Sequence, residues 1–184
     1  MKSACVLLAP GCEEMEAVTV IDVLRRGGVE VVAAGLQAGV FEASRGVRLE
    51  ADLPLENLAE AKEFDLLVLP GGLPGTLALR DDSRVRDLLI HYFNHPEKRV
   101  GVICAAPLVL DAHGLLEGRI FTCYPSVAKE IQGGTRVDET VVVDGNLITS
   151  QGPGTAIAFA LRLLEELMGR GCAEDVAAGM LYQS

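Results

Sequence analysis

The chain has 184 residues, 49% hydrophobic and 23% charged, so it can bury a sizeable core and does not have the composition of a disordered chain. Sixteen basic and 26 acidic residues give a formal net charge of −10, which argues against nucleic acid or an anionic membrane surface as the main partner. No apolar run has the length of a membrane span, and the N-terminus does not read as a signal peptide, so we expect a cytoplasmic protein.

Short apolar runs alternate with stretches of helical periodicity along the chain. The apolar runs are 4–9, 29–34, 64–69 and 100–103, and the helical stretches are 15–26, 83–93, 107–113 and 156–168. Continuous Val, Ile and Leu runs are typical of parallel strands buried on both faces. Two regions break the alternation, a short antiparallel excursion at 40–49 and a hairpin at 137–149 with its turn at Asp144-Gly145. We predict one α/β domain over residues 1–184, with a mostly parallel sheet and helices on both faces.

Two of the expected helices carry local signals that the structure can test. Ser83 stands where the helix over 83–93 should begin and is a candidate N-cap. In the helix over 156–168, helical spacing places one set of apolar residues on a common face. That set is Ile157, Ala160, Leu161, Leu164 and Met168.

The cysteines show neither a disulfide framework nor zinc-ligand spacing. They are Cys5, Cys12, Cys104, Cys123 and Cys172. Their odd number and wide spacing predict free thiols and no metal site. We expect Cys5 in the core and Cys172 in a loop before the last helix. Cys12 and Cys123 fall near strand ends on the side of Cys104, where each is either inert or a resolving thiol.

Cys104 is the first candidate for chemistry, because it follows the strand over 100–103 and precedes a helix. A sharp strand-to-helix turn exposes a side chain to the unpaired N–H groups of the helix, which predicts a lowered thiol pKa and a nucleophile. The alternative is a buried cysteine that ends a strand. In open α/β sheets the carboxyl ends of the strands carry the site, which places this position at the right edge.

Two other loops at that edge contribute candidates. Glu13, Glu14 and Glu16 open the first helix, where carboxylates commonly face water, but one turned inward near Cys104 could move a proton. Gly71 and Gly72 follow the strand over 64–69, either as a simple turn or as backbone amides that stabilise an oxyanion.

Six segments occur in an order that resembles the ThiJ/PfpI superfamily, in particular the branch of the Parkinson-disease-linked protein deglycase and its YajL-type bacterial relatives. They are LAPGCEEME at 8–16, DVLRRG at 22–27, SRG at 44–46, LPGG at 69–72, ICAAP at 103–107 and TSQGPGT at 149–155. The resemblance covers about residues 3–180. It implies a flavodoxin-like three-layer sandwich and a homodimer whose interface includes the first helix, with Met15, Val18 and Ile21.

The resemblance also implies roles for single residues. Cys104 matches the oxidisable nucleophile, and Glu16 matches the carboxylic acid that hydrogen-bonds to it. Gly71 and Gly72 match amides beside the thiolate, and we expect the Ala105 amide to join them. The remaining matches are Arg26 and Arg45, which approach the site from across or near the dimer interface, and the pocket loop with Gly152, Pro153 and Gly154.

The implied activity is a cofactor-independent glyoxalase or protein deglycase acting on methylglyoxal, glyoxal or their early glycation adducts. The alternative is a non-catalytic sensor of oxidative stress, or a chaperone, that uses the oxidisable Cys104. The chain departs from many relatives at two positions: Tyr124 replaces a histidine, and Gln151 replaces an arginine before Gly-Pro-Gly.

Two related activities are excluded by the sequence. The peptidase branch needs a histidine directly after the nucleophilic cysteine, where this chain has Ala105. Glutamine amidotransferases place their His-x-Glu motif well after the nucleophile, whereas His95-Pro96-Glu97 precedes Cys104. We therefore expect neither activity.

Overall fold

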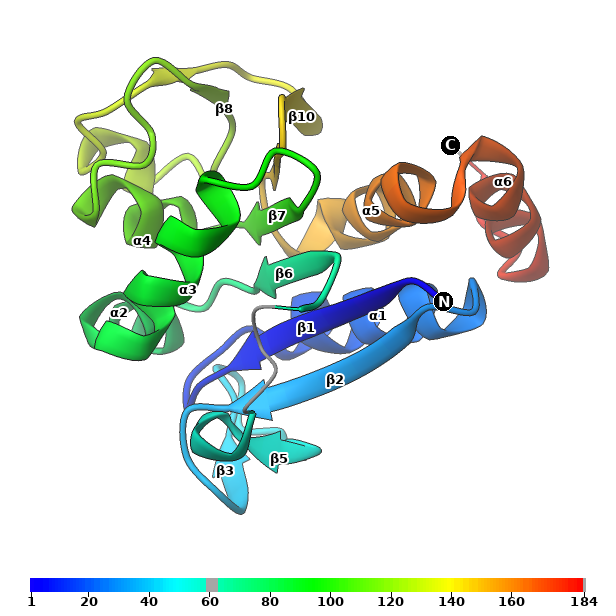
Figure 1. Cartoon of the computed structure of the whole chain (residues 1–184), viewed down its shortest axis with the longest axis horizontal. Coiled ribbons are helices and arrows are strands. Elements are labelled where there is room, and N and C mark those ends of the chain that lie inside the picture. The colour runs from blue at the N-terminus through cyan, green and yellow to red at the C-terminus, as the bar shows by residue number, and fades with distance from the viewer. Residues whose placement is uncertain (59–62, 184) are drawn as a thin grey trace.

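A computed structural model describes residues 1–58 and 63–183 (Figure 1). The helices are α1 (Glu14–Arg26), α2 (Leu73–Asp81), α3 (Ser83–Phe93), α4 (Pro107–Ala112), α5 (Ala156–Met168) and α6 (Arg170–Gly179). The longer strands are β1 (Ser3–Leu8), β2 (Glu30–Gly35), β6 (Leu66–Leu69), β7 (Arg99–Ile103), β10 (Val141–Asp144) and β11 (Leu147–Ser150). The shorter ones are β3 (Val40–Glu42), β4 (Arg48–Glu50), β5 (Leu53–Pro54), β8 (Ile120–Phe121) and β9 (Thr135–Arg136).

The main sheet has the strand order β10-β11-β7-β6-β1-β2-β5. All neighbours in it pair in parallel except β10 and β11, which form an antiparallel hairpin. The order β2-β1-β6-β7-β11 is that of flavodoxin-like sheets, in which ligands bind where the strand order reverses. The predicted fold class is therefore confirmed, and the reversal lies at the carboxyl ends of β1 and β6.

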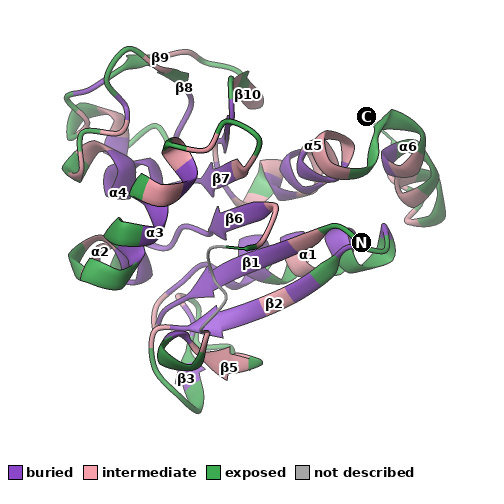
Figure 2. Cartoon of the chain, in the orientation of Figure 1, coloured by how far each residue is buried: buried purple, intermediate pink, exposed green. Residues whose placement is uncertain are grey.

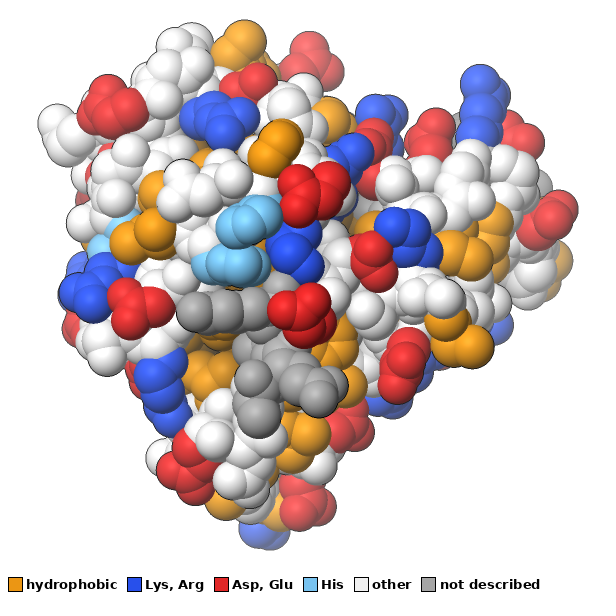
Figure 3. Space-filling model, viewed as in Figure 1, with side chains coloured by type: hydrophobic (Ala, Val, Ile, Leu, Met, Phe, Trp, Pro, Cys, Tyr) orange, Lys and Arg blue, Asp and Glu red, His pale blue; other side chains and the backbone are white. Residues whose placement is uncertain are grey.

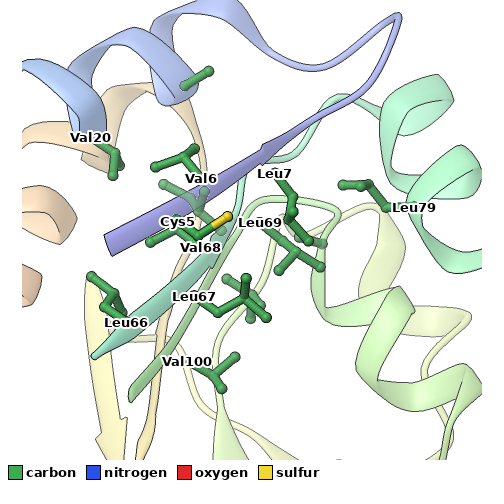
Figure 4. Close-up of a cluster of buried hydrophobic side chains, with 14 of the residues drawn as sticks. Cys5, Val6, Leu7, Val20, Leu66, Leu67, Val68, Leu69, Leu79 and Val100 are labelled. Carbon is green, nitrogen blue, oxygen red and sulfur yellow. The ribbon is translucent and has the colours of Figure 1, made fainter. Parts of the chain in front are cut away.

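Helices cover both faces of this sheet, and its central strands are buried (Figure 2). Helix α1 packs against α5, which also contacts α6, while α2 packs against α3 and α4. In the core, side chains of β1, β6 and β7 lie between Val20 of α1 and Leu79 of α2 (Figure 4). Such continuous burial of Val and Leu is the main source of stability in a three-layer sandwich.

Both expected antiparallel excursions are confirmed. Strands β3 and β4 pair in register from Val40 opposite Glu50, and β10 and β11 pair around a turn at Gly145, whose φ of +59° favours glycine. The N-cap of α3, however, is Asp82 rather than Ser83, because the Asp82 carboxylate accepts the Arg84 N–H at 2.9 Å.

The buried face of α5 differs from the predicted one. It consists of Ala156, Phe159, Ala160, Leu163 and Leu164. Ile157 and Leu161 are half-buried and Met168 is exposed, because the sheet and α1 contact a neighbouring stripe of the helix. Leu161 instead lines a groove beside α6, a helix that includes Cys172 and replaces the expected loop.

The surface in Figure 3 shows acidic and basic side chains intermixed over the visible face. Within the two described ranges, no helix combines the length and apolarity needed to cross a membrane.

Candidate active site

Cys104 stands at the tight turn between β7 and α4. Its φ of +63° lies in the left-handed region, which non-glycine residues rarely adopt, and its side chain is 9% exposed. Two backbone bonds hold this conformation: the Cys104 N–H donates to the Ser150 carbonyl at 3.1 Å, and its carbonyl accepts the Tyr124 N–H at 2.9 Å. Strain that is locked in this way is typical of functional positions, as in a nucleophile elbow.

Glu16 reaches the same point from the first turn of α1. Its side chain is fully buried, and Oε2 accepts the Gly71 N–H at 2.7 Å. The turn is fixed by Glu13, the N-cap of α1, whose Oε2 accepts the Glu16 N–H at 2.8 Å. The second oxygen of Glu16, Oε1, is buried and bonds to no N–H or O–H group of the described residues. The carboxyl group is adjacent to the Cys104 thiol, since a Cβ on Gly71 would lie 2.8 Å from Glu16 Oε2 and 3.0 Å from the Cys104 sulfur.

The glycines after β6 allow this close approach. A Cβ on Gly71 would lie 2.5 Å from the Cys104 Cβ and 2.8 Å from Glu16 Oε2. Gly72 has a φ of +83°, and a Cβ there would lie 2.4 Å from the Gly11 carbonyl oxygen. Position 71 and position 72 therefore both require glycine.

The backbone amides divide into two roles. The N–H groups of Gly72 and Ala105 face the Cys104 sulfur and stabilise its negative charge. The Gly71 N–H, which was expected beside the thiolate, instead binds Glu16. Gly71 therefore positions the acid and does not serve as a donor to the sulfur.

Burial dominates the titration of this pair. It raises the pKa of Glu16 from 4.5 to about 7, against the lowering effect of the bonds from Gly71 and Cys104. Burial also raises the pKa of the Cys104 thiol to about 12, and the charge of Glu16 adds to this rise. The expected lowering of the thiol pKa is therefore wrong. The two groups compete for one proton, so a thiolate forms most readily when Glu16 holds it.

Of the two arginines expected near the site, Arg45 lies beside it and Arg26 does not. Arg45 is next to the first turn of α1, where its N–H donates to Glu14 Oε1 at 2.9 Å. Arg26 ends α1 and pairs with Asp22 at 2.6 Å on the exposed surface. Ten residues of helix separate Arg26 from Glu16, or about 15 Å at the rise of an α-helix. Arg26 therefore does not join the site of its own chain.

Glu14 fixes the β3–β4 hairpin beside the site. Its Oε2 also accepts the Ser44 hydroxyl at 2.9 Å. Burial alone would raise the Glu14 pKa, but the bonds from Ser44 and Arg45 together hold it below its ordinary value. Glu14 is therefore an ionised structural carboxylate, unlike Glu16.

A shallow pocket of about 210 Å³ lies beside the Cys104 turn. It is lined by Tyr124, Pro125, Gln151, Gly152, Pro153, Gly154 and Thr155. The loop is closed by hydroxyl bonds: the Thr155 Oγ1 lies 2.7 Å from the Ser150 Oγ and 3.1 Å from the Gly152 N. Because the Ser150 carbonyl binds Cys104, the same segment holds both the Cys104 turn and the pocket wall.

The DJ-1/PfpI family matches residues 2–166 of the chain. The chain belongs to this family. It is 47% identical over 183 residues to protein dj-1beta of Drosophila melanogaster, covering 98% of this chain and 97% of that protein. The crystal structure of Drosophila melanogaster DJ-1beta superposes with a TM-score of 0.95 at 46% identity, over 100% of this chain and 99% of that one. A Caenorhabditis elegans protein named glutathione-independent glyoxalase DJR-1.2 is 38% identical over 170 residues, or 91% of this chain and 90% of that protein.

Family membership confirms the resemblance to the ThiJ/PfpI proteins. The other cysteines of this DJ-1/PfpI chain are all free thiols. Cys5, Cys12 and Cys123 are fully buried, and burial raises the pKa of each. This burial does not favour the resolving role that was one interpretation of Cys12 and Cys123.

Some residues near the site could not be predicted from the sequence. Ser150 supplies its carbonyl to Cys104, but its sequence signal is only its place at a strand end. Asp138 accepts from both Arg136 and Gln151, at 3.1 and 2.9 Å. This pairing joins irregular segments, so no periodicity or motif in the sequence could indicate it.

Proposed function

We propose that this DJ-1/PfpI protein is a cysteine-dependent glyoxalase and protein deglycase. Its substrates would be methylglyoxal, glyoxal or their early glycation adducts, with Cys104 as nucleophile and Glu16 as general acid and base. The observation that carries the proposal is the buried contact between the Glu16 carboxyl and the Cys104 thiol, with a Glu16 pKa of about 7. A pKa near the working pH is what a group that both takes and gives protons needs. The naming of the Caenorhabditis elegans relative as a glyoxalase supports the same reading.

In the first step, the Cys104 proton passes to Glu16, and the sulfur adds to the aldehyde carbon of the dicarbonyl. This forms a C–S bond, and Glu16 returns the proton to the aldehyde oxygen, which gives a hemithioacetal and restores the carboxylate. The N–H groups of Gly72 and Ala105, which face the sulfur, would stabilise the negative charge that moves from sulfur to oxygen.

In the second step, Glu16 as carboxylate removes the hydrogen from the former aldehyde carbon as a proton and returns it to the neighbouring carbonyl carbon. The hydroxyl on the first carbon gives up its proton, and the oxygen on the second carbon takes one up. The first carbon thus becomes a thioester and the second an alcohol, with no net gain or loss of protons. Water then cleaves the thioester, which releases lactate from methylglyoxal or glycolate from glyoxal and restores the thiol. The sum is addition of one water to the dicarbonyl, with no outside oxidant or reductant.

The test is methylglyoxal consumption with lactate detection by the wild type, Cys104→Ala and Cys172→Ala. The last is a matched control, because Cys172 lies on α6, away from the site. We expect turnover in the wild type and the control, and none in Cys104→Ala. Equal turnover in Cys104→Ala, or no lactate from the wild type, would overturn the proposal.

Peroxide sensing is a second candidate, favoured by the same N–H groups. A Cys104 thiolate that attacks a peroxide gives a sulfenate and water, and a second peroxide gives a sulfinate. The Gly72 and Ala105 amides and a protonated Glu16 could donate to the new oxygens. Intact mass after peroxide titration should then show two added oxygens in the wild type and none in Cys104→Ala.

We also propose a cytoplasmic homodimer. The outer face of α1 exposes Met15 by 58% and Val18 by 50%, and Val47 of the adjacent hairpin is 47% exposed. A second copy covering this apolar face could bring its Arg26 to the neighbouring subunit. Light scattering tests the state, and a mass near 19.5 kDa would contradict the dimer.

A further inference from the structure

Asp138 joins two side chains that lie beside the pocket. Its Oδ1 accepts Arg136 Nη2 at 3.1 Å and Gln151 Nε2 at 2.9 Å. Arg136 lies on β9, whereas Gln151 follows β11 and lines the pocket. The Gln151 side chain is therefore held from outside the pocket by a hydrogen bond to Asp138, a carboxylate that is 80% exposed and also pairs with Arg136.

The anchor decides which end of the Gln151 amide a ligand can use. A carboxylate only accepts hydrogen bonds, so the amide nitrogen must face Asp138. The amide oxygen is then the polar atom left for a ligand, and it accepts no bond from the described part of the chain. Position 151 thus presents an acceptor, where an arginine would present a cation.

The residues that line the pocket also carry no positive charge. Arg136 directs its guanidinium to Asp138 and toward Cys123, and it is not among the residues that line the pocket. The lining residues, Tyr124, Pro125 and Gln151 to Thr155, are all uncharged. The Asp138 carboxylate behind Gln151 is paired with Arg136, so the pocket wall offers no unpaired cation to an anion.

We propose that Gln151, oriented by Asp138, makes this site select neutral ligands that carry a hydrogen-bond donor over ligands that carry a carboxylate. Suitable groups are the hydroxyl of a hemithioacetal or the hydroxyl and N–H of an aminocarbinol adduct. The inference rests on the proposed function for its substrate class, but the selectivity itself belongs to the pocket next to Cys104.

Alkylation of Cys104 tests this without turnover. Iodoacetamide and iodoacetate both attack the thiolate, are similar in size, and differ in carrying an amide or a carboxylate. Peptide mass mapping gives the two rate constants at Cys104, and their ratio cancels any change in thiol pKa. The same ratio for N-acetylcysteine is the reference. A second readout is the rate at which the protein consumes phenylglyoxal, a neutral dicarbonyl, and 4-carboxyphenylglyoxal, its anionic counterpart.

We expect the wild type to prefer iodoacetamide by about fivefold more than the free thiol does at low salt. Gln151→Arg should abolish this preference, because it should speed the reaction with iodoacetate. Gln151→Leu should reduce it, because it should slow the reaction with iodoacetamide. Asp138→Asn should reduce it, whereas Glu174→Gln, which removes a carboxylate from α6, should leave it unchanged. An unchanged ratio in both Gln151 variants would overturn the inference. If the ratios shift but no dicarbonyl is consumed, only the proposed function fails.

Discussion

Gly71 donates its backbone N–H to the Glu16 carboxyl at 2.7 Å, and this bond ties the loop after β6 to the first turn of α1. Oε2 can accept that bond whether or not the carboxyl is protonated, whereas Oε1 is buried without a hydrogen-bond partner among the described residues. Glu16 can therefore gain or lose a proton without losing its position. The Gly71 amide thus positions the carboxyl beside the Cys104 thiol without bonding to the sulfur.

Glu16→Gln should keep the bond to Gly71, through the amide oxygen, and lose proton transfer. We expect kcat/KM for methylglyoxal to fall by about 10²–10⁴-fold, the usual contribution of a general acid or base. Glu13→Gln is the control, because an amide oxygen can still cap α1 and accept the Glu16 N–H. Activity of Glu16→Gln within about threefold of wild type would rule out a proton-transfer role.

The raised pKa of Glu16 also predicts how stability depends on pH. The unfolded chain releases this proton near pH 4.5, whereas the folded protein keeps it up to about pH 7. The folded state thus binds more protons in this window, so the stabilisation is complete below pH 4.5 and is lost as pH rises to 7. The loss should be about 3 kcal/mol relative to Glu16→Gln.

Urea unfolding of both proteins between pH 4.5 and 8 measures that difference. Carboxylates with lowered pKa values, such as Asp65 and Asp82, change stability in the opposite sense, but they are common to both proteins and cancel. Parallel pH profiles for wild type and Glu16→Gln would contradict a carboxyl that stays protonated near neutrality.

Much of the fold follows from the sequence, because strands buried on both faces leave unbroken apolar runs such as those of β1 and β6. The helix α2 was not predicted, since its residues lack a clear apolar periodicity and it begins directly after Gly72. The stripe of α5 was misplaced because the whole helix is rich in apolar residues, and only tertiary contact decides which side is covered.

Parts of the candidate site could also be predicted from the sequence, and other parts could not. Cys104, Glu16 and Gly71 stand in loops at the carboxyl ends of three strands, so topology and the family resemblance together could select them. The direction of the thiol pKa could not be predicted, because it depends on how tightly the site excludes water. The contact between Asp138 and Gln151 also depends on tertiary packing and leaves no sequence pattern.

Gly71→Ala should disrupt the site and lower stability. The new methyl group would lie 2.5 Å from the Cys104 Cβ and 3.0 Å from its sulfur, in a turn that is already strained. We expect a loss of about 1–3 kcal/mol, typical of overpacking, with little residual activity. Gly171→Ala on α6 is the control, since a Cβ there meets nothing within 4 Å. Thermal and urea unfolding compare the two, and equal stability would show that the site has room for a side chain.

The sequence predicts Ser83 as the N-cap of α3, whereas the structure has Asp82, and one experiment can decide between them. The Asp82 carboxylate accepts the Arg84 N–H at 2.9 Å and also pairs with its guanidinium at 2.6 Å, whereas Ser83 is the first helical residue. Asp82→Ala should therefore cost about 1 kcal/mol of unfolding free energy, the usual value of an N-cap. Ser83→Ala should change stability by less than about 0.5 kcal/mol, because alanine suits the first turn of a helix. The reverse order in urea unfolding would identify Ser83 as the true cap and place the start of α3 one residue later.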